Sequence, residues 1–349
     1  MGINRIMLKN VLVFKHKFEM DFCSGVNLLI GGNGIGKTTI LKVLYMMNDA
    51  TKHERQLPTV EEYNNKKTDF ECGKNGLDKS LYFPYHYYGS GIRHAYSSNY
   101  NRMSDDVSLY ETFEGGAFEG KYEVITAYGL LQSYDMTFIP NNDMLSHAEG
   151  FLALYSEYKL PFDKMRRDII AKAELPVTRK VSSGAEILLE KIKNIIGGEV
   201  THERGVFYID KSDGERVPFS IEASAFQKFG LLWKLIRNGL LKKDSILLWD
   251  EPENSLNPEF VPVLVDIMLE LSRNGVQIFI ATHSEILSSY FDVSRKDGDE
   301  VMFASLYREG DFVKVNTGDR FNWLEPNSLT EAPVKLYEKK LDKGLGGNG

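Results

Sequence analysis

The chain has 349 residues, 42% of them hydrophobic, and a formal net charge of −7. It contains only two cysteines, Cys23 and Cys72, which excludes a disulfide framework and a cysteine zinc site. The acidic balance excludes a general electrostatic attraction to nucleic acid, and no apolar run has transmembrane length. Because the N-terminus also lacks a signal-peptide pattern, we expect a cytoplasmic protein without a membrane partner.

The first 30 residues predict three strands. Residues 6–14 and 17–22 alternate in part between apolar and polar side chains, and the apolar run 26–30 predicts a buried strand. Residues 39–47 follow with apolar side chains at helical spacing.

Between that strand and that helix, residues 31–39 read Gly-Gly-Asn-Gly-Ile-Gly-Lys-Thr-Thr. They match the phosphate-binding loop G-x-x-x-x-G-K-[ST] in the strand–loop–helix context that the motif requires, which disfavours a chance Gly-rich turn. We expect Lys37 to reach the β- and γ-phosphates of ATP and the Thr38 hydroxyl to ligate Mg²⁺. The predicted nucleotide-binding residues of this loop are Asn33, Gly34, Ile35, Gly36, Lys37, Thr38 and Thr39.

The segment 48–105 is polar and irregular. Within it, residues 82–102 interleave tyrosines with histidines and arginines, a pattern that is able to stack bases and neutralise phosphates. A Tyr-rich lid on the core, or one tyrosine stacking on adenine, is the interpretation that we favour, because the segment is short and the chain is acidic.

The next elements are a hairpin, a strand and a helical region. Residues 107–113 and 122–126 predict a hairpin around a Gly-rich turn at 115–120, and 136–139 predict a short buried strand. Apolar spacings of three and four predict helices over 147–158, 162–173 and 185–196.

The C-terminal half predicts a parallel sheet. A second hairpin over 205–209 and 216–219 precedes a helix over 225–241. Strand 245–249, helix 258–273 and strand 276–281 then stand in βαβ order. Two strands over 300–316 and a solvated helix from residue 331 complete the chain.

A second functional motif lies on the first of those strands. Residues 246–258 form an apolar run that ends in Asp250 and Glu251 and continues Pro-Glu-Asn-Ser-Leu-Asn-Pro. This is a Walker-B arrangement, in which Asp250 holds Mg²⁺ through its water shell and Glu251 polarises the attacking water. Surface acids at an ordinary strand end are the alternative, which the separate phosphate-binding loop disfavours.

Together with Thr282-His283-Ser284 after the following strand, these motifs resemble the ABC-type ATPase heads of SMC, RecF and OLD proteins. The resemblance covers roughly residues 1–45 and 135–290 and is closest to compact "AAA family ATPase" proteins, many of which act in bacterial anti-phage systems. It implies an α/β P-loop NTPase with a mixed sheet core and a small inserted helical lobe. The implied divisions are 1–141 for an N-terminal nucleotide-binding lobe, 142–204 for the helical lobe and 205–349 for a C-terminal lobe.

The resemblance also implies roles for single residues. His283 corresponds to the switch histidine at the γ-phosphate, and Asn257 lies in a D-loop, 255–258, that touches the partner subunit. Ser224 and Ala225 occupy the signature motif, which caps the nucleotide of the other protomer. Here Ala225 replaces the usual glycine and Ala223 stands where a serine is usual, so an ordinary helix cap is an equal alternative. A Q-loop would require a glutamine after Ile139, and none directly follows it. We nominate Asn142 and Asp143 for the role of that glutamine, or Gln132 on the other side of the strand.

These implications lead to one functional hypothesis. Lys37, Glu251 and His283 would cleave ATP slowly with Mg²⁺ in a homodimer or higher homo-oligomer, and the dimer would switch a separately encoded effector in a defence or toxin-like system. The segment 145–200 is too short for a long coiled coil, and after residue 290 no acidic cluster resembles a Toprim nuclease. The alternatives are a RecF/SMC-like DNA-repair ATPase, which keeps nucleic acid open as a partner, and a non-hydrolysing ATP-gated scaffold.

Overall fold

The computed structural model describes residues 2–54, 95–97, 106–112, 122–128, 134–158, 160 and 162–345. The Tyr-rich stretch 82–102, apart from 95–97, lies outside the described residues, as do the predicted turn at 115–120 and Gln132. Among the described residues, no helix is both long and apolar enough to cross a membrane.

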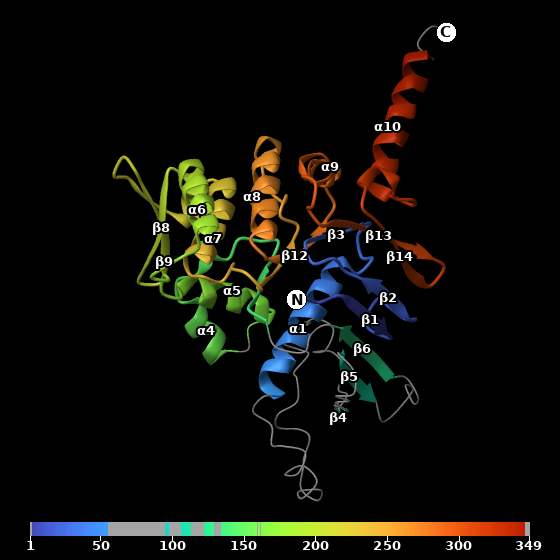
Figure 1. Ribbon diagram of the computed structural model, residues 1–349, viewed down its shortest axis with the longest axis horizontal. Helices are drawn as coiled ribbons and strands as arrows, with labels where there is room; N and C mark the ends of the chain where they lie inside the picture. Colours follow the sequence, from blue (N-terminus) through green and yellow to red (C-terminus); the bar gives the residue numbers. More distant parts are fainter. Residues whose placement is uncertain are drawn as a thin grey trace, which may run out of the picture.

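A six-stranded mixed sheet forms the centre of the molecule (Figure 1), in the order β14-β13-β3-β12-β11-β7. Five strands are parallel and β14 runs antiparallel to its neighbour. The strands are β3 (Val26–Gly31), β7 (Met136–Ile139), β11 (Ile246–Asp250), β12 (Gln277–Thr282), β13 (Val301–Glu309) and β14 (Phe312–Gly318). The βαβ order predicted from sequence is confirmed.

Helices cover both faces of this sheet, which is why its inner strands β3 and β11 are buried at every position and are mostly apolar. Along β11, Leu248 belongs to the core shared with α1 (Lys37–Glu54), whereas Trp249 belongs to the core shared with α8 (Val261–Arg273). On that second face α8 packs against α9 (Glu285–Ser294), a helix that the sequence patterns did not predict. A 3₁₀ turn, Pro258–Phe260, leads into α8.

A second, antiparallel sheet has the order β2-β1-β6-β5-β4. Its strands are β1 (Arg5–Lys9), β2 (Phe18–Asp21), β4 (Ala95–Ser97), β5 (Asp106–Thr112) and β6 (Tyr122–Tyr128). The predicted pairing of β5 with β6 is confirmed. The predicted strand 6–14 is too long, because Asn10 and Leu12 adopt positive φ and turn the chain after Lys9.

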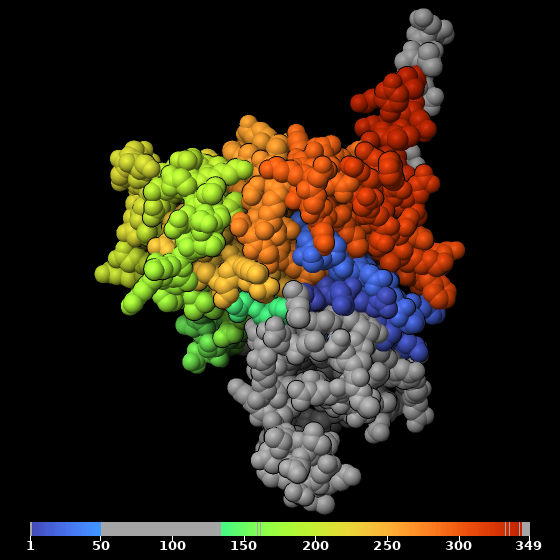
Figure 2. All heavy atoms as spheres, in the orientation of Figure 1, coloured from blue at the N-terminus to red at the C-terminus, as the bar shows by residue number. Residues whose placement is uncertain are grey.

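The helical region contains α4 (Phe151–Glu157), α5 (Lys164–Glu174) and α6 (Ser183–Ile196), and α6 packs on α7 (Ser224–Arg237). Beside them lies a small sheet of β8 (Gly198–Glu203), β9 (Val206–Lys211) and β10 (Arg216–Pro218), in which β8 is a strand that we did not predict. The last helix, α10 (Ser328–Leu345), projects from the body of the molecule (Figure 2).

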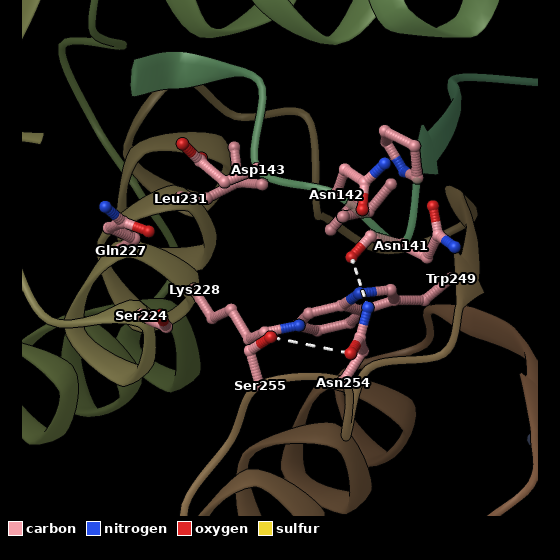
Figure 3. Close-up of a pocket in the computed structure, with 12 residues that line it drawn as sticks. Asn141, Asn142, Asp143, Ser224, Gln227, Lys228, Leu231, Trp249, Asn254 and Ser255 are labelled. Carbon is pink, nitrogen blue, oxygen red and sulfur yellow. Dashed lines mark hydrogen bonds between the residues drawn. The ribbon is translucent and has the colours of Figure 1, made fainter. Parts of the chain in front are cut away.

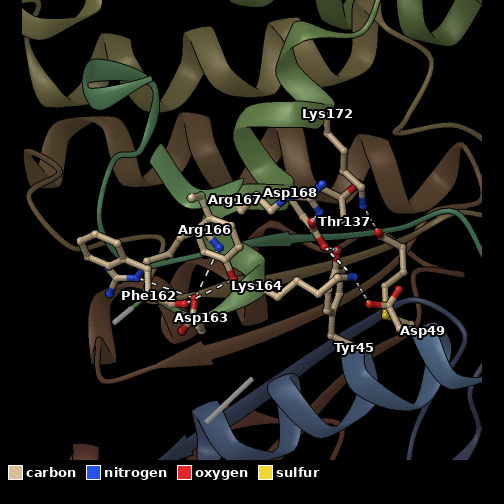
Figure 4. Close-up of polar contacts among 12 residues, drawn as sticks. Tyr45, Asp49, Thr137, Phe162, Asp163, Lys164, Arg166, Arg167, Asp168 and Lys172 are labelled. Atoms are coloured by element: carbon tan, nitrogen blue, oxygen red, sulfur yellow. Dashed lines mark hydrogen bonds and ion pairs between the residues drawn. The ribbon is translucent and has the colours of Figure 1, made fainter. Parts of the chain in front are cut away.

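Polar contacts join α1 to α5 (Figure 4). Lys42 pairs with Asp163 at 2.7 Å, and the Tyr45 hydroxyl donates to Asp168 at 2.8 Å. Lys164 pairs with Asp168 at 3.1 Å and also with Asp49 of α1. The helix that follows the phosphate-binding loop is therefore tied to the first long helix of the helical region.

Candidate active site

The predicted motifs meet at one edge of the central sheet. The phosphate-binding loop follows β3, Asp250 ends β11, and His283 follows β12, which lies between those two strands. Since the strands are parallel, their carboxyl ends share one edge, which is where ligands bind in open α/β sheets.

Two glycines of the loop are required by its path. Gly31 has φ +143°, and a Cβ there would lie 2.5 Å from the backbone oxygen of Leu306 on β13. Gly36 has φ +108°, and its Cβ would lie 2.6 Å from the ring of Phe14. Larger residues at these two positions would displace the backbone whose N–H groups surround a phosphate.

Lys37 lies under this loop, with 5% of its surface exposed. Its ammonium donates to the carbonyl oxygens of Gly31 and Gly32 at 2.8 and 2.9 Å. Burial lowers the pKa of Lys37 to about 8, although Glu251, Asp250 and Glu253 oppose that shift. These two hydrogen bonds hold the side chain in place, and its ammonium is positioned to bind an anion.

Thr38 and Asp250 form a hard-oxygen pair. The Thr38 hydroxyl donates to Asp250 Oδ1 at 2.8 Å, and burial raises the pKa of Asp250 to about 6, so the carboxylate is mostly ionised at neutral pH. Mg²⁺ prefers one or two protein oxygens together with water and phosphate oxygens, and these two side chains fit that requirement. The ion would neutralise charge between the β- and γ-phosphates.

His283 lies between the loop and the Walker-B strand. Its Nδ1 is 3.4 Å from the ammonium of Lys37, and its Nε2 is 3.3 Å from Oε1 of Glu251. Because an ammonium only donates, the first contact is a hydrogen bond in the tautomer whose proton is on Nε2, facing Glu251. Burial, and then the charge of Lys37, lower the pKa of His283, which favours this neutral form.

Glu251 has an unusual backbone. Its φ is +48°, a left-handed conformation that costs a non-glycine residue about 1 kcal/mol. Its N–H still donates to the Ala281 oxygen at 2.8 Å, so the residue remains attached to β12 while the chain turns away from the sheet. Strain of this kind is concentrated at functional sites.

The signature and D-loop residues lie elsewhere. Ser224 and Ala225 begin α7, whose N-cap residue, Ala223, forms no side-chain cap. Asn257 caps the 3₁₀ turn before α8 by accepting from the N–H of Glu259 at 3.3 Å. Within one chain, neither group joins Lys37, Glu251 and His283.

Ser224 instead lines a cavity of about 110 Å³ between α7, the D-loop and the segment after β7 (Figure 3). Lys228 extends into it and, within the described part of the chain, forms no hydrogen bond or ion pair. Trp249 also lines the cavity, and its buried indole N–H has no acceptor among the described residues. Burial lowers the pKa of Lys228 to about 8.

The structure places two residues at the site that we had not nominated. Asn141 Nδ2 donates to Oε2 of Glu251 at 3.5 Å, whereas Asn142 is exposed and Asp143 caps the turn at Leu145–His147. Glu253 accepts from the backbone N–H of His283 at 2.9 Å. Its position two residues after Glu251 is the sequence signal that would have identified it.

Comparisons with known proteins agree with this geometry. The family model described as "AAA domain, putative AbiEii toxin, Type IV TA system" matches residues 26–289, most of the chain. The arginine transport ATP-binding protein ArtP of Haemophilus influenzae is 31% identical over 86 residues, 25% of this chain and 32% of that protein. The glutamine transport ATP-binding protein GlnQ of Geobacillus stearothermophilus is 31% identical over 68 residues, 20% of this chain and 26% of that protein.

The chain thus spans about a third or less of the length of these curated relatives. Among solved structures, the SMC head domain from Thermotoga maritima aligns over 90% of this chain and 98% of that chain, with 12% identity and a TM-score of 0.42. From the family match and from the motifs gathered at the edge of the central sheet, we conclude that the chain belongs to this AAA-domain family and is an ATP-binding head of the ABC type.

Proposed function

We propose that this chain hydrolyses ATP with Mg²⁺ in a closed homodimer and that closure switches a separately encoded effector of a cytoplasmic defence or toxin-like system. One observation carries the hydrolytic part. The imidazole of His283 lies between the ammonium of Lys37 and the carboxylate of Glu251, beside the hard-oxygen pair Thr38–Asp250. These are the charges that phosphoryl transfer to water requires, on one rigid sheet edge.

Each side chain then has one task. Lys37 would bind the β- and γ-phosphate oxygens, Thr38 and Asp250 would hold Mg²⁺, and Glu251 would accept the proton of the attacking water. The Nε2–H of His283 faces Glu251, and the same N–H would be the donor to a γ-phosphate oxygen once ATP is bound. Asn141 fixes the second oxygen of Glu251.

The signature side supports the homodimer. Ser224 lies away from Lys37 within one chain, beside a cavity whose lysine and indole donors have no acceptors in the described structure. In a two-fold dimer one interface forms both composite sites. The proposal of an effector rests on the toxin-system description of the family.

Steady-state phosphate release is the direct test of hydrolysis. We expect slow turnover that Glu251→Gln lowers by about 100-fold while ATP binding persists, and that Lys37→Ala abolishes together with binding. Asp266→Asn, an exposed acid on α8, is the control. A wild-type protein that binds ATP without turnover would indicate a non-hydrolysing scaffold instead.

Affinity capture with ATP and the Glu251→Gln protein tests the biological role. A stoichiometric protein partner that is absent with Lys37→Ala supports the effector. Captured DNA without such a partner, with steep salt dependence, would contradict the effector and favour a DNA-repair ATPase.

A further inference from the structure

Glu253 connects the two segments that carry Glu251 and His283. Its Oε1 accepts from the Thr282 hydroxyl at 2.5 Å and from the backbone N–H of His283 at 2.9 Å. Thr282 is the last residue of β12 and is fully buried. One carboxylate oxygen thus fixes the backbone at the point where β12 ends and the segment carrying His283 begins.

The same contacts continue into α9. The N–H of Ser284 donates to Oγ1 of Thr282 at 2.9 Å, and the Ser284 hydroxyl accepts from the N–H of Leu287 at 3.0 Å, capping the helix. Residues 282–284 are therefore held on both sides of His283, and Glu253 is the contact that comes from the Walker-B segment.

The position of this backbone matters because the imidazole contacts are long. His283 is 3.4 Å from Lys37 and 3.3 Å from Glu251, at the outer limit of hydrogen bonding. A displacement of less than 1 Å at residue 283 would break one or both contacts, and errors of this size cost enzymes about 100-fold in rate.

The second carboxylate oxygen of Glu253 indicates that this residue acts through its charge and not through packing alone. Oε2 is buried and has no hydrogen-bond partner within the described residues. A buried, unsatisfied carboxylate oxygen is costly, so a group that only packed there would be more stable without charge. The negative charge opposes the lowering of the His283 pKa by burial and by Lys37, and Glu251 acts in the same direction.

We propose that Glu253 is a positioning residue, which holds residues 282–283 so that the imidazole of His283 bridges Lys37 and Glu251. It sets the rate of ATP cleavage and leaves ATP affinity nearly unchanged, because its hydrogen bonds go to Thr282 and His283 and its effect on Lys37 is that of a more distant charge. The expected effect on kcat rests on the proposed hydrolysis. The effect of Glu253 on the position of His283 does not depend on turnover.

The kinetic test separates kcat from ATP affinity. We expect Glu253→Ala to lower kcat about 30- to 100-fold with Kd for ATP within about threefold of wild type. Glu253→Gln keeps an oxygen acceptor and loses the charge, so its kcat should lie between that of the wild-type protein and that of Glu253→Ala. Thr282→Val should resemble Glu253→Ala, while Thr282→Ser, which restores the hydroxyl, should return kcat to near the wild-type value.

Glu270→Gln is the matched control, because Glu270 pairs with Arg273 on the surface of α8. It should change neither kcat nor Kd. Equal losses in kcat and ATP affinity for Glu253→Ala, or a Thr282→Ser protein as slow as Thr282→Val, would overturn the proposal.

A second readout does not depend on turnover. In protein labelled with ¹⁵N-histidine, the imidazole signals of His283, assigned with His283→Gln, report its tautomer and hydrogen bonds. Glu253→Ala should shift them and Glu270→Gln should not. Unchanged His283 signals in Glu253→Ala would refute the positioning role, even if the wild-type protein proved inactive and the proposed hydrolysis failed.

Discussion

The hydrolytic edge of the sheet and the signature side of the same molecule differ in how their polar groups are satisfied. At the sheet edge, Lys37 donates to two carbonyl oxygens and Thr38 is bonded to Asp250. Around the cavity beside α7, Lys228 and the indole of Trp249 have no acceptors among the described residues. The donors of the first region are hydrogen-bonded before any ligand binds, whereas the second region has donors without acceptors, as expected of a surface that is completed by another molecule.

The largest effect is expected from damage to the first of these regions. Gly36→Ala should weaken ATP binding by about 100-fold or more, because its Cβ would meet Phe14 at 2.6 Å and displace the loop. Isothermal titration calorimetry measures this. Gly214→Ala is the control: Gly214 also has positive φ, at +92°, but nothing lies within 4 Å of its Cβ. If both variants bind ATP equally well, the loop is not the binding site.

Asp250→Asn should affect binding only when metal is present. The change removes the charge of the hard-oxygen pair, so ATP affinity in Mg²⁺ should fall by about 10- to 100-fold, with little change in EDTA. The ratio of the two dissociation constants is the measurement. An equal loss in both buffers would show that Asp250 supports the loop structurally rather than through a metal.

A smaller effect is expected from pH. The pKa of Lys37 is about 8 without ligand, and bound phosphates raise it, so ATP binding takes up a proton above pH 8. Affinity should be flat from pH 6.5 to 7.5 and then weaken by about tenfold per pH unit above 8. Lys228→Met should keep this slope, although Lys228 also has a pKa of about 8. A flat profile up to pH 9.5 would contradict the assignment.

The smallest effect concerns the signature side. Trp249→Phe removes an indole N–H that has no acceptor in the described structure, so the free energy of unfolding should change by less than about 1 kcal/mol. Trp249→Ala should cost about 3–5 kcal/mol through the cavity that it leaves. Chemical denaturation compares the two. A loss in Trp249→Phe as large as that in Trp249→Ala would show that the N–H already has a partner.

The sequence predicted those parts of the fold that local patterns determine. The phosphate-binding loop and the strand ending in Asp250 carry their own signatures, and the βαβ order implied the parallel sheet that brings them together. The pairing of Glu253 with His283 was not predictable in this way, because it joins residues 30 apart through a side chain. Helix α9 was missed because only two residues, His283 and Ser284, separate it from a buried strand, too few to mark off the two patterns.

Which residue after β7 contacts Glu251 was not predictable for a related reason. Asn141, Asn142 and Asp143 are chemically similar, and only the geometry of the turn decides which one faces Glu251. The Asp143 carboxylate accepts from two backbone N–H groups of the turn that follows it, whereas the Asn141 amide donates to Glu251.

The contacts between α1 and α5 have a mechanical consequence. Lys42, Tyr45 and Asp49 lie on one face of the helix that begins at Lys37, and they contact Lys164 and Asp168 of α5 and its N-cap residue, Asp163. A rotation of α5 against the sheet would strain several charged contacts at once, so the two helices should turn as one unit. Force applied to the helical region by a bound molecule would then reach Lys37 through a single rigid helix. The affinity for nucleotide would therefore change with the applied force.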